Sequence, residues 1–254
     1  MLVLIPLSEH FMNEKTLVLS IALNGYQWMY KTEINSHKKY AENNGYAYQA
    51  VTKPYITRLG VECCWLKLTL IKKALLSGYR TVLFLDADTF VKPNCPNLSK
   101  VIKVDKYIYM AKGYSGRFNS GVLLVRNNIK TLSWLDSVIN ARDKCVEKEN
   151  DVGWGENGHI IEYSKEVTFI GELSNKWNNT FDHGLNDFIR HSNCGPMRTN
   201  YMTNFFHKVV FYFSARMMSI TIKVQRLFQI TPKKNLLFTE TRKILSIYPK
   251  ITNS

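Results

Sequence analysis

Short, largely apolar runs alternate with segments of helical spacing over the first 90 residues of the chain. Residues 15–23 (KTLVLSIAL) and 80–85 (RTVLFL) are runs of strand length, and residues 46–51 form a weaker third run. Residues 26–43 and 62–77 lie between these runs, and each segment ends close to a glycine, as helices commonly do. This β-α-β-α-β order predicts an α/β protein with a doubly wound, mostly parallel sheet, whose ligands bind beyond the carboxyl ends of the strands.

The rest of the pattern extends this sheet within a chain of 254 residues, a length that one α/β domain can hold. We expect further strands near residues 107–111, 120–125 and 167–170, and helices near residues 129–141 and 157–163. A composition of 45% hydrophobic and 21% charged residues excludes a disordered chain. The five cysteines are odd in number without CxxC spacing, and charges interrupt the apolar N-terminus. We therefore expect reduced thiols, no signal peptide and a cytoplasmic protein.

Basic residues concentrate at the C-terminal end of the chain. Residues 198–254 carry ten Lys and Arg and a single acidic residue, within a net charge of +14 for the whole chain. An apolar seam with alternating spacings of four and three residues begins this region, formed by Phe206, Val210, Phe213, Met217, Ile220, Val224 and Leu227. We therefore divide the chain into a globular domain, residues 1–204, and a basic amphipathic helical tail, residues 205–254.

A basic amphipathic helix of this kind fits the surface of an anionic membrane, where the apolar face enters the lipid and the basic residues meet the headgroups. Two other interpretations stay open, in which the seam packs on the preceding domain or on a second copy of the chain. We expect no nucleic-acid partner, because a phosphate groove calls for basic and polar residues and not for a continuous apolar seam.

Two carboxylates follow the most apolar strand of the predicted sheet. Asp86 and Asp88 are separated by one residue directly after the run at residues 80–85, so they project from the carboxyl end of a buried strand. Hard oxygen ligands suit Mg²⁺ or Mn²⁺ and, through the metal, a diphosphate. A lone Asp-x-Asp is usually a solvated turn, but two carboxylates at the end of a buried strand destabilise the fold unless a cation or a partner neutralises them.

Five segments in order along the chain resemble the motifs of a known family. They are TVLFLDADTFV at residues 81–91, RFNSGV at 117–122, GENG at 155–158, LSNKWN at 173–178 and IRHS at 189–192. Together they resemble the nucleotide-sugar site of the retaining GT-A glycosyltransferases of the glycogenin-like family eight and, more distantly, the fungal family 34 enzymes. The chain departs from the family pattern where Glu156 replaces an Asp, where Asn157 replaces a Gln, and where the Lys-Pro-Trp after the family's His is missing.

The resemblance implies a GT-A-like catalytic domain over residues 1–204 with a metal held by three residues. His191 becomes the third protein ligand of a Mn²⁺ or Mg²⁺ ion beside Asp86 and Asp88, which leaves positions for two phosphate oxygens. Asn119, Glu156 and Asn157 are expected at the donor sugar. Taken one residue at a time, plainer structural interpretations exist. His191 could be a core or surface histidine with its hydrogen bonds satisfied, Asn119 could cap a turn, and Glu156 could be a carboxylate at the start of a helix.

The nucleotide is expected to contact five residues of the same domain, which are Asn24, Tyr26, Lys67, Asp86 and Arg198. Asn24 and Tyr26 are candidates for a uridine pocket because they follow the first strand. The family uses a lysine near the nucleotide at the position of Lys67, which as a helix residue is otherwise only solvated. Arg198 stands in for the family's diphosphate-clamping lysine, and Trp65 is expected in the core.

These observations predict a metal-dependent glycosyltransferase that moves a hexose from a nucleotide sugar, a UDP-hexose, to a glycan or glycolipid acceptor such as a lipopolysaccharide or capsule precursor. Retention of the anomeric configuration is implied by the resemblance alone, and the tail suggests a peripheral protein on the cytoplasmic face of a membrane. A sugar nucleotidyltransferase is the closest alternative, but the early Gly-rich phosphate loop expected of it is missing from the sequence. The other alternative is a non-catalytic membrane-binding or nucleic-acid-binding module.

Overall fold

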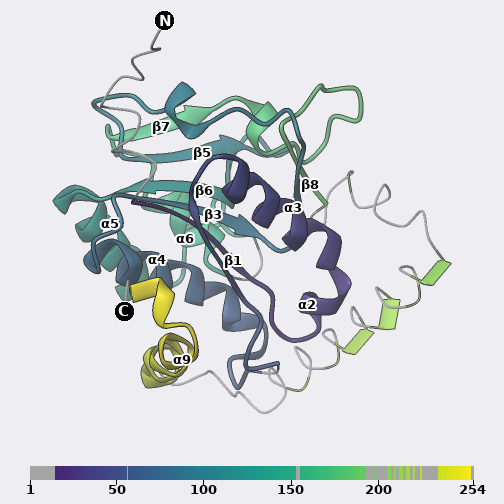
Figure 1. Ribbon diagram of the computed structural model, residues 1–254. Helices are drawn as coiled ribbons and strands as arrows, with labels where there is room; N and C mark the ends of the chain where they lie inside the picture. The colour runs from purple at the N-terminus through teal and green to yellow at the C-terminus, as the bar shows by residue number, and fades with distance from the viewer. Residues whose placement is uncertain are drawn as a thin grey trace, which may run out of the picture.

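A six-stranded sheet forms the centre of the computed structural model, which describes residues 15–55, 57–152, 155–192, 197 and 234–252, and single residues between 205 and 224 (Figure 1). The strand order is β2-β1-β3-β6-β5-β7, with β1 (Thr16–Ile21), β2 (Ala47–Val51), β3 (Thr81–Asp86), β5 (Ile108–Lys112), β6 (Phe118–Arg126) and β7 (Ile170–Leu173). Three strand pairs are parallel, and only β6 runs antiparallel to its neighbours β3 and β5. The predicted α/β class with a mostly parallel sheet is confirmed.

Helices connect these strands largely where the sequence predicts them. The α-helices are α2 (Tyr26–Met29), α3 (Lys31–Asn43), α4 (Leu66–Leu76), α5 (Ile129–Asn140), α6 (Asn157–Glu162) and α9 (Lys234–Ile247). Shorter 3₁₀ turns are η1 (Gly60–Trp65), η2 (Leu98–Lys100), η3 (Asn175–Trp177) and η4 (Pro249–Thr252).

Three predicted elements differ clearly from the structure in their bounds. Residues 62–77 form the 3₁₀ turn η1 followed by the α-helix α4, and not one α-helix. Residues 26–43 form two helices, because the backbone leaves helical geometry at Tyr30 (φ −109°, ψ 32°), between α2 and α3. The strand expected near residues 167–170 begins only at Ile170, because the preceding residues form turns after α6. Local apolar pattern does not distinguish a strand from the turns that lead into it.

The strands β1 and β3 at the centre of the sheet bury both of their faces, which is why they read as continuous apolar runs in the sequence. Leu17 and Val82 point to a core that they share with α4, α5 and α9. Their chain neighbours Val18 and Leu83 point to a second core on the other face, which includes Tyr40 of α3. The sheet is therefore covered by helices on both sides, and its carboxyl edge is left for ligands.

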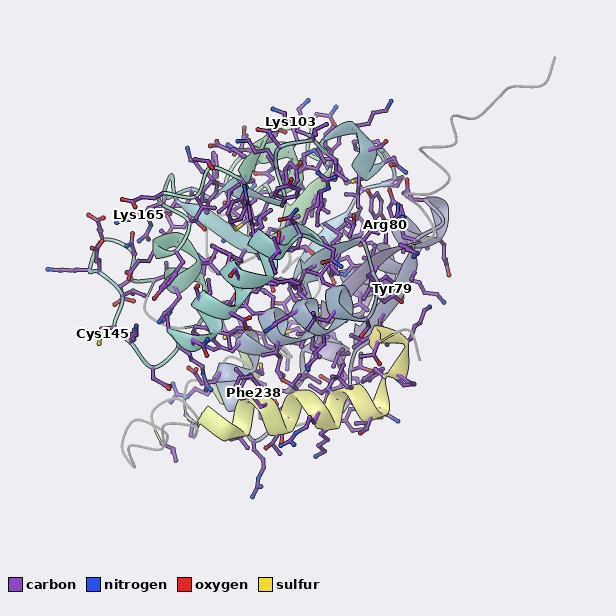
Figure 2. All side chains as sticks on the ribbon, turned by 90° about the vertical axis from the view of Figure 1, so that its left-hand side faces the viewer. Tyr79, Arg80, Lys103, Cys145, Lys165 and Phe238 are labelled. Atoms are coloured by element: carbon purple, nitrogen blue, oxygen red, sulfur yellow. The ribbon has the colours of Figure 1, made fainter. Side chains whose placement is uncertain are left out.

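The C-terminal helix α9 and the turn η4 pack against α4. Their apolar side chains enter the same core as α4, where Leu237, Ile244 and Ile251 are buried. Figure 2 shows α9 lying along one side of the protein, with Phe238 labelled toward its beginning and Tyr79 near its end. The hydroxyl of Tyr79 donates to the carbonyl of Lys250 at 2.9 Å. Residues 234–252 thus help to close the core beneath the sheet.

Replacing Ile244 with Ala should lower the free energy of unfolding by about 2–5 kcal/mol, because it empties a fully buried site between α9 and α4. Ile247→Ala, on the same helix, is the matched control, since Ile247 is 40% exposed. We expect Ile247→Ala to lower the free energy of unfolding by well under half as much as Ile244→Ala does. Urea unfolding followed by tryptophan fluorescence measures both values, and equal losses would mean that α9 does not contribute Ile244 to the core.

An exposed apolar face lies between residues 205 and 224. The residues described there are helical and exposed, and the large apolar ones are Phe205, Phe206, Val209, Tyr212, Phe213, Met217, Ile220 and Val224. Arg216 is exposed among them. Val210 and Leu227, also part of the predicted seam, lie outside the described residues. Of the helices that the structure describes, none is long and apolar enough to cross a membrane.

Candidate functional site

Asp86 and Asp88 lie at the carboxyl end of β3, where the sequence predicts them. Asp86 is the last residue of β3, and a turn through Asp88 leads into the short strand β4 (Thr89–Val91). The hydroxyl of Thr89 closes this turn by donating to the carbonyl of Asp86 at 2.8 Å. The side chains remain 34% and 17% exposed, so an ion from solvent can reach both carboxylates.

A second, two-stranded sheet brings His191 to these carboxylates. β4 pairs antiparallel with β8 (Ile189–His191), and His191 lies opposite Thr89, the residue that follows Asp88. The backbone N–H of Ser192 donates to the carbonyl of Asp88 at 2.9 Å, which fixes the register. Nε2 of His191 is therefore 3.2 Å from Oδ1 of Asp88, although the two residues are far apart in sequence.

Asp86, Asp88 and His191 together offer three ligand atoms that lie within 4.8 Å of one another. Burial would raise the pKa of Asp88, but the charge and hydrogen bond of His191 outweigh it, so this pKa lies below its usual value. Burial would lower the pKa of His191, but Asp88 outweighs it and raises that pKa. The site thus favours positive charge between these side chains. Two carboxylate oxygens and one imidazole nitrogen fit Mn²⁺ or Mg²⁺ in such a position.

Gly121 of β6 leaves the space that His191 occupies. A Cβ atom at position 121 would lie 2.1 Å from Cε1 and 2.7 Å from Nδ1 of the imidazole, closer than a Cβ atom approaches a non-bonded carbon or nitrogen. Any side chain at Gly121 would therefore displace His191 from Asp88. The glycine of the FNSG segment is explained by this close approach and not by its backbone conformation.

Lys67 is a buried cation between two carboxylates of the site. Its ammonium group lies 2.6 Å from Oε1 of Glu156 and 3.2 Å from Oδ1 of Asp86, and it donates to the carbonyl and hydroxyl oxygens of Ser120 at 3.1 and 3.2 Å. The hydroxyl of Ser120 donates to the same Glu156 oxygen at 2.8 Å. Lys67, from α4, thus joins the end of β3 to the start of β6 and to α6.

The opposite charges of Lys67 and Glu156 stabilise each other. Burial would raise the pKa of Glu156, but Lys67 outweighs it, so the pKa lies below its usual value and the carboxylate is ionised at neutral pH. Burial would lower the pKa of Lys67, but Asp86 and Glu156 raise it well above the ordinary value. Burial raises the pKa of Asp86, an effect that Lys67 only partly opposes. Glu156 is therefore a fixed negative charge beside the candidate metal ligands.

The amides of Asn119 and Asn157 hold the start of β6 in place. Oδ1 of Asn157 accepts from the backbone N–H of Ser120 at 2.8 Å, and its Nδ2 donates to the carbonyl of Phe118 at 3.2 Å. Oδ1 of Asn119 accepts from the backbone N–H of Gly121 at 3.0 Å. Because β6 is antiparallel to β3, its first residues lie at the same sheet edge as Asp86. Both amides therefore adjoin the cluster that contains Glu156.

Asn24 and Tyr26, the candidates for a uridine pocket, follow the carboxyl end of β1. Asn24 has a left-handed backbone (φ 56°), and its side chain accepts from the N–H of Thr57 at 2.9 Å and donates to the carbonyl of Gly60 at 3.0 Å. Its amide thus supports the loop after β2. Tyr26 opens α2 and its ring packs against Tyr30 at 5.2 Å. Arg198 lies outside the described residues.

Two further residues of the site were not singled out from the sequence. Ser120 links Lys67 to Glu156, and Asn178 contacts both Asn119 and His191. Both lie inside segments that resemble the family motifs, FNSG and LSNKWN, and this was the signal available. Their contacts span 13 to 59 residues of sequence, so no local pattern assigns them a partner.

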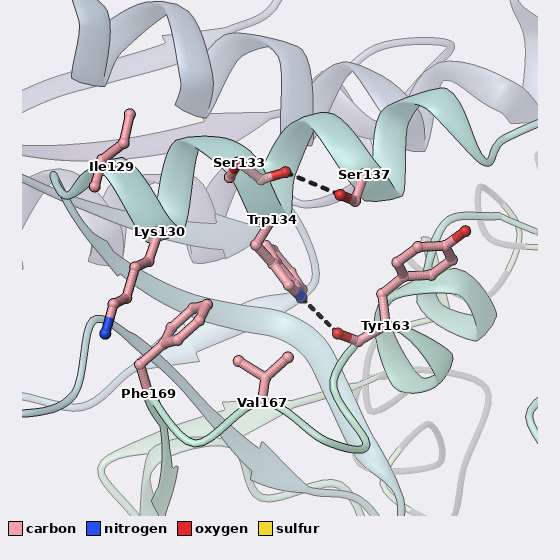
Figure 3. Close-up of a pocket in the computed structure, with 8 residues that line it drawn as sticks. All are labelled: Ile129, Lys130, Ser133, Trp134, Ser137, Tyr163, Val167 and Phe169. Carbon is pink, nitrogen blue, oxygen red and sulfur yellow. Dashed lines mark hydrogen bonds between the residues drawn. The ribbon is translucent and has the colours of Figure 1, made fainter.

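A surface pocket of about 460 Å³ lies between α5 and the segment that follows α6 (Figure 3). It is lined by Ile129, Lys130, Ser133, Trp134, Ser137, Tyr163, Val167 and Phe169. The indole N–H of Trp134 points across it and donates to the carbonyl of Tyr163 at 2.8 Å. The candidate metal, sugar and nucleotide residues take no part in this lining.

Comparison with solved structures identifies the fold. A glycosyltransferase involved in the glycosylation of the major capsid of PBCV-1 matches with a TM-score of 0.57 and 15% sequence identity, covering 73% of this chain and 98% of that protein. The fold is that of a glycosyltransferase. Glycosyltransferase GlyE of Streptococcus pneumoniae matches with a TM-score of 0.49 at 16% identity, covering 85% of this chain and 64% of that one. Neither a protein-family model nor a curated protein matches the sequence.

Proposed function

We propose that the protein is a metal-dependent glycosyltransferase that moves a hexose from a UDP-hexose to a glycan or glycolipid acceptor. The observation that carries this proposal is the convergence of Asp86, Asp88 and His191 at the carboxyl edge of a sheet with a glycosyltransferase fold. Retention of the anomeric configuration is part of the proposal through the resemblance to family eight. That resemblance, and not the geometry, supplies the stereochemistry.

In this proposal Asp86, Asp88 and His191 hold a Mn²⁺ or Mg²⁺ ion, which supplies positive charge for the departing diphosphate. Lys67 neutralises part of the negative charge at Asp86 and fixes the orientation of Glu156. The Glu156 carboxylate then hydrogen-bonds the hexose or stabilises the cationic character at its anomeric carbon.

The remaining predicted residues take supporting roles around the donor. Asn119 and Asn157 shape the wall of the sugar site through the backbone of β6. Tyr26 lines the uridine pocket, and Asn24 sets the loop beside it. Arg198 clamps the diphosphate, as its position after the histidine segment suggests.

Donor hydrolysis by the purified chain tests the proposal. A panel of UDP-hexoses with Mn²⁺ should contain a donor from which UDP and free hexose are released, and chelation of the metal should stop the release. At 100 times its dissociation constant this donor should stabilise the protein by about 2.7 kcal/mol in a thermal shift measurement. Release of pyrophosphate from UTP and a sugar 1-phosphate would instead indicate a nucleotidyltransferase, and a panel without any Mn²⁺-dependent effect would overturn the metal-dependent transfer.

We also propose that the acceptor is reached at an anionic membrane surface, to which the protein binds peripherally on the cytoplasmic side. The exposed apolar face between residues 205 and 224 supports this, because Phe213 and Ile220 are presented to solvent next to Arg216. The sequence adds Lys208, Lys223 and Arg226 to the same region. Apolar side chains are more stable in lipid than in water, and the cations beside them are attracted to anionic headgroups.

Ile220→Glu should reduce partitioning onto phosphatidylcholine–phosphatidylserine vesicles by about tenfold, or about 1.4 kcal/mol, and leave donor hydrolysis unchanged. The glutamate places a negative charge in the apolar face and next to anionic lipid. Ile129→Glu is the matched control, because Ile129 is exposed on α5, outside this face. Sedimentation at low and high salt measures the binding, which should weaken as salt rises. Unchanged vesicle binding, or loss of a dimer instead, would contradict the membrane role.

A further inference from the structure

Asn178 is a fully buried residue that connects the candidate sugar contact Asn119 with the candidate metal ligand His191. Its Nδ2 lies 3.2 Å from the carbonyl oxygen of Asn119 and 2.9 Å from Oδ1 of the same residue. Its Oδ1 lies 2.9 Å from Nδ1 of His191. One amide therefore contacts both a candidate sugar-binding residue and a candidate metal ligand.

The backbone holds Asn178 in this position independently of its side chain. The N–H of Asn179 donates to the carbonyl of Ile189 at 2.9 Å, and the N–H of His191 donates to the carbonyl of Asn179 at 2.9 Å. The segment after η3 thus runs beside β8, with Asn178 next to His191. Replacing the side chain removes the amide contacts and leaves these backbone bonds in place.

The orientation of the Asn178 amide follows from groups whose chemistry is fixed. The backbone N–H of Gly121 can only donate, so the atom of Asn119 that it meets is the oxygen Oδ1. This oxygen and the carbonyl of Asn119 can only accept, so the end of Asn178 that faces them is its NH₂ group. The other end is then an oxygen, which can only accept a hydrogen bond, so Nδ1 of His191 is the donor. The chain of contacts therefore assigns the proton on the imidazole to Nδ1.

We propose that Asn178 is a positioning residue that fixes His191 with its proton on Nδ1 and with Nε2 directed at the metal. Nε2 is the nitrogen that faces Asp88 at 3.2 Å, where it can donate to the carboxylate. When a metal ion takes the place of the Nε2 proton, the proton held on Nδ1 would leave the Nε2 lone pair for the ion. Partners of this kind behind a metal-binding histidine contribute about 10-fold to 100-fold to metal affinity. The inference rests on the metal site of the proposed function.

Mn²⁺ titration of the full chain in the absence of donor, followed by calorimetry, tests the inference. Asn178→Ala should weaken Mn²⁺ binding by about 10-fold or more. Asn178→Asp keeps an oxygen for the Nδ1–H but gives up the two NH₂ contacts to Asn119, so it should keep more of the Mn²⁺ affinity than Asn178→Ala does. Asn175→Ala, three residues earlier, is the matched control and should not change the affinity. If Asn178→Ala fails to fold, Asn178→Ser takes its place.

A double-mutant cycle shows whether Asn178 acts through His191. In a His191→Ala background, Asn178→Ala should cause little further loss of Mn²⁺ affinity, because the two residues belong to one contact. Equal losses in Asn178→Asp and Asn178→Ala, or additive losses in the cycle, would overturn the inference while leaving the metal site intact. Mn²⁺ binding that is absent, or unaffected by His191→Ala and Asp88→Asn, would overturn the metal site itself and this inference with it.

Discussion

Replacing Asp88 with Asn should abolish Mn²⁺-dependent turnover of the UDP-hexose, with a loss of at least about a thousandfold. A metal ion contributes several kcal/mol of charge stabilisation to such a transition state, and about 4 kcal/mol corresponds to a thousandfold in rate. Asn keeps the shape of the side chain but removes the charge that faces His191. The fold should persist, because the repulsion from Asp86 that is relieved offsets part of the lost pairing with His191, and Asp88 lies in a turn at the edge of the sheet. Hydrolysis rates against Mn²⁺ concentration measure the effect, with thermal unfolding as the check on the fold.

Asp105→Asn provides the matched control for this variant. It is the same substitution at a side chain that is 70% exposed and lies in the loop before β5, away from the cluster. It should leave both hydrolysis and Mn²⁺ dependence unchanged. Metal-stimulated turnover that survives in Asp88→Asn would show that the Asp-x-Asp pair does not hold the ion, whatever the fold resembles.

The position of the two carboxylates could be predicted from local sequence. Residues 81–86 form β3 because its side chains are buried on both faces, and a strand of this kind is marked by composition alone. The carboxyl edge of a doubly wound sheet then becomes the expected ligand site. Asp86 and Asp88 were therefore expected at the edge where the structure places them.

The position of His191 could not be derived in the same way. β4 and β8 have three residues each, too few to show a periodicity, and yet their pairing brings His191 to Asp88. Only the resemblance of the IRHS segment to a family motif indicated the histidine. The need for a glycine at position 121 could not be derived from local sequence either, because it comes from the His191 imidazole of β8 packed against it.

Lys67 shows why a residue on a helix cannot be assigned from its helix alone. The spacing of residues 62–77 predicts the helical turn, and the sequence left a solvated lysine as the plainer interpretation. The structure buries Lys67, because its partners Ser120 and Glu156 arrive from 53 and 89 residues further along the chain. The C-terminal region gives a second example. Its excess of basic residues sets it apart in the sequence but does not indicate that Ile244 packs beside α4.

Glu156→Gln should lower turnover of the donor by about a hundredfold or more while UDP affinity changes little. The glutamine keeps the length and shape of the side chain, and its oxygen can still accept from Lys67 and Ser120. The change therefore removes a buried negative charge without emptying its site. If that charge stabilises a cationic sugar in the transition state, its loss appears in kcat, since binding of UDP uses other residues.

The variant also carries a pH signature that separates the carboxylate's effect on the fold from its effect on turnover. The pKa of Glu156 lies below its usual value of 4.5, so the ionised group stabilises the fold above that pH and loses this contribution as the pH falls through the lowered pKa. The difference in free energy of unfolding between the unmodified protein and Glu156→Gln should therefore be largest at pH 7. It should shrink as the pH falls below the lowered pKa of Glu156. A loss of turnover at pH 7 in protein that remains folded is then a loss of chemistry.

Glu172→Gln is the matched control for the charge itself, because Glu172 is an exposed carboxylate of β7 that also pairs with a lysine. It should turn over the donor as the unmodified protein does, and the comparison isolates what a buried charge adds beside the metal ligands. The kcat of each variant with every accepted UDP-hexose, together with the Kd of UDP, decides the role. Near-normal turnover in Glu156→Gln would leave Glu156 as the carboxylate that starts α6 and anchors Lys67, and the hexose would then have to meet a different group of the site.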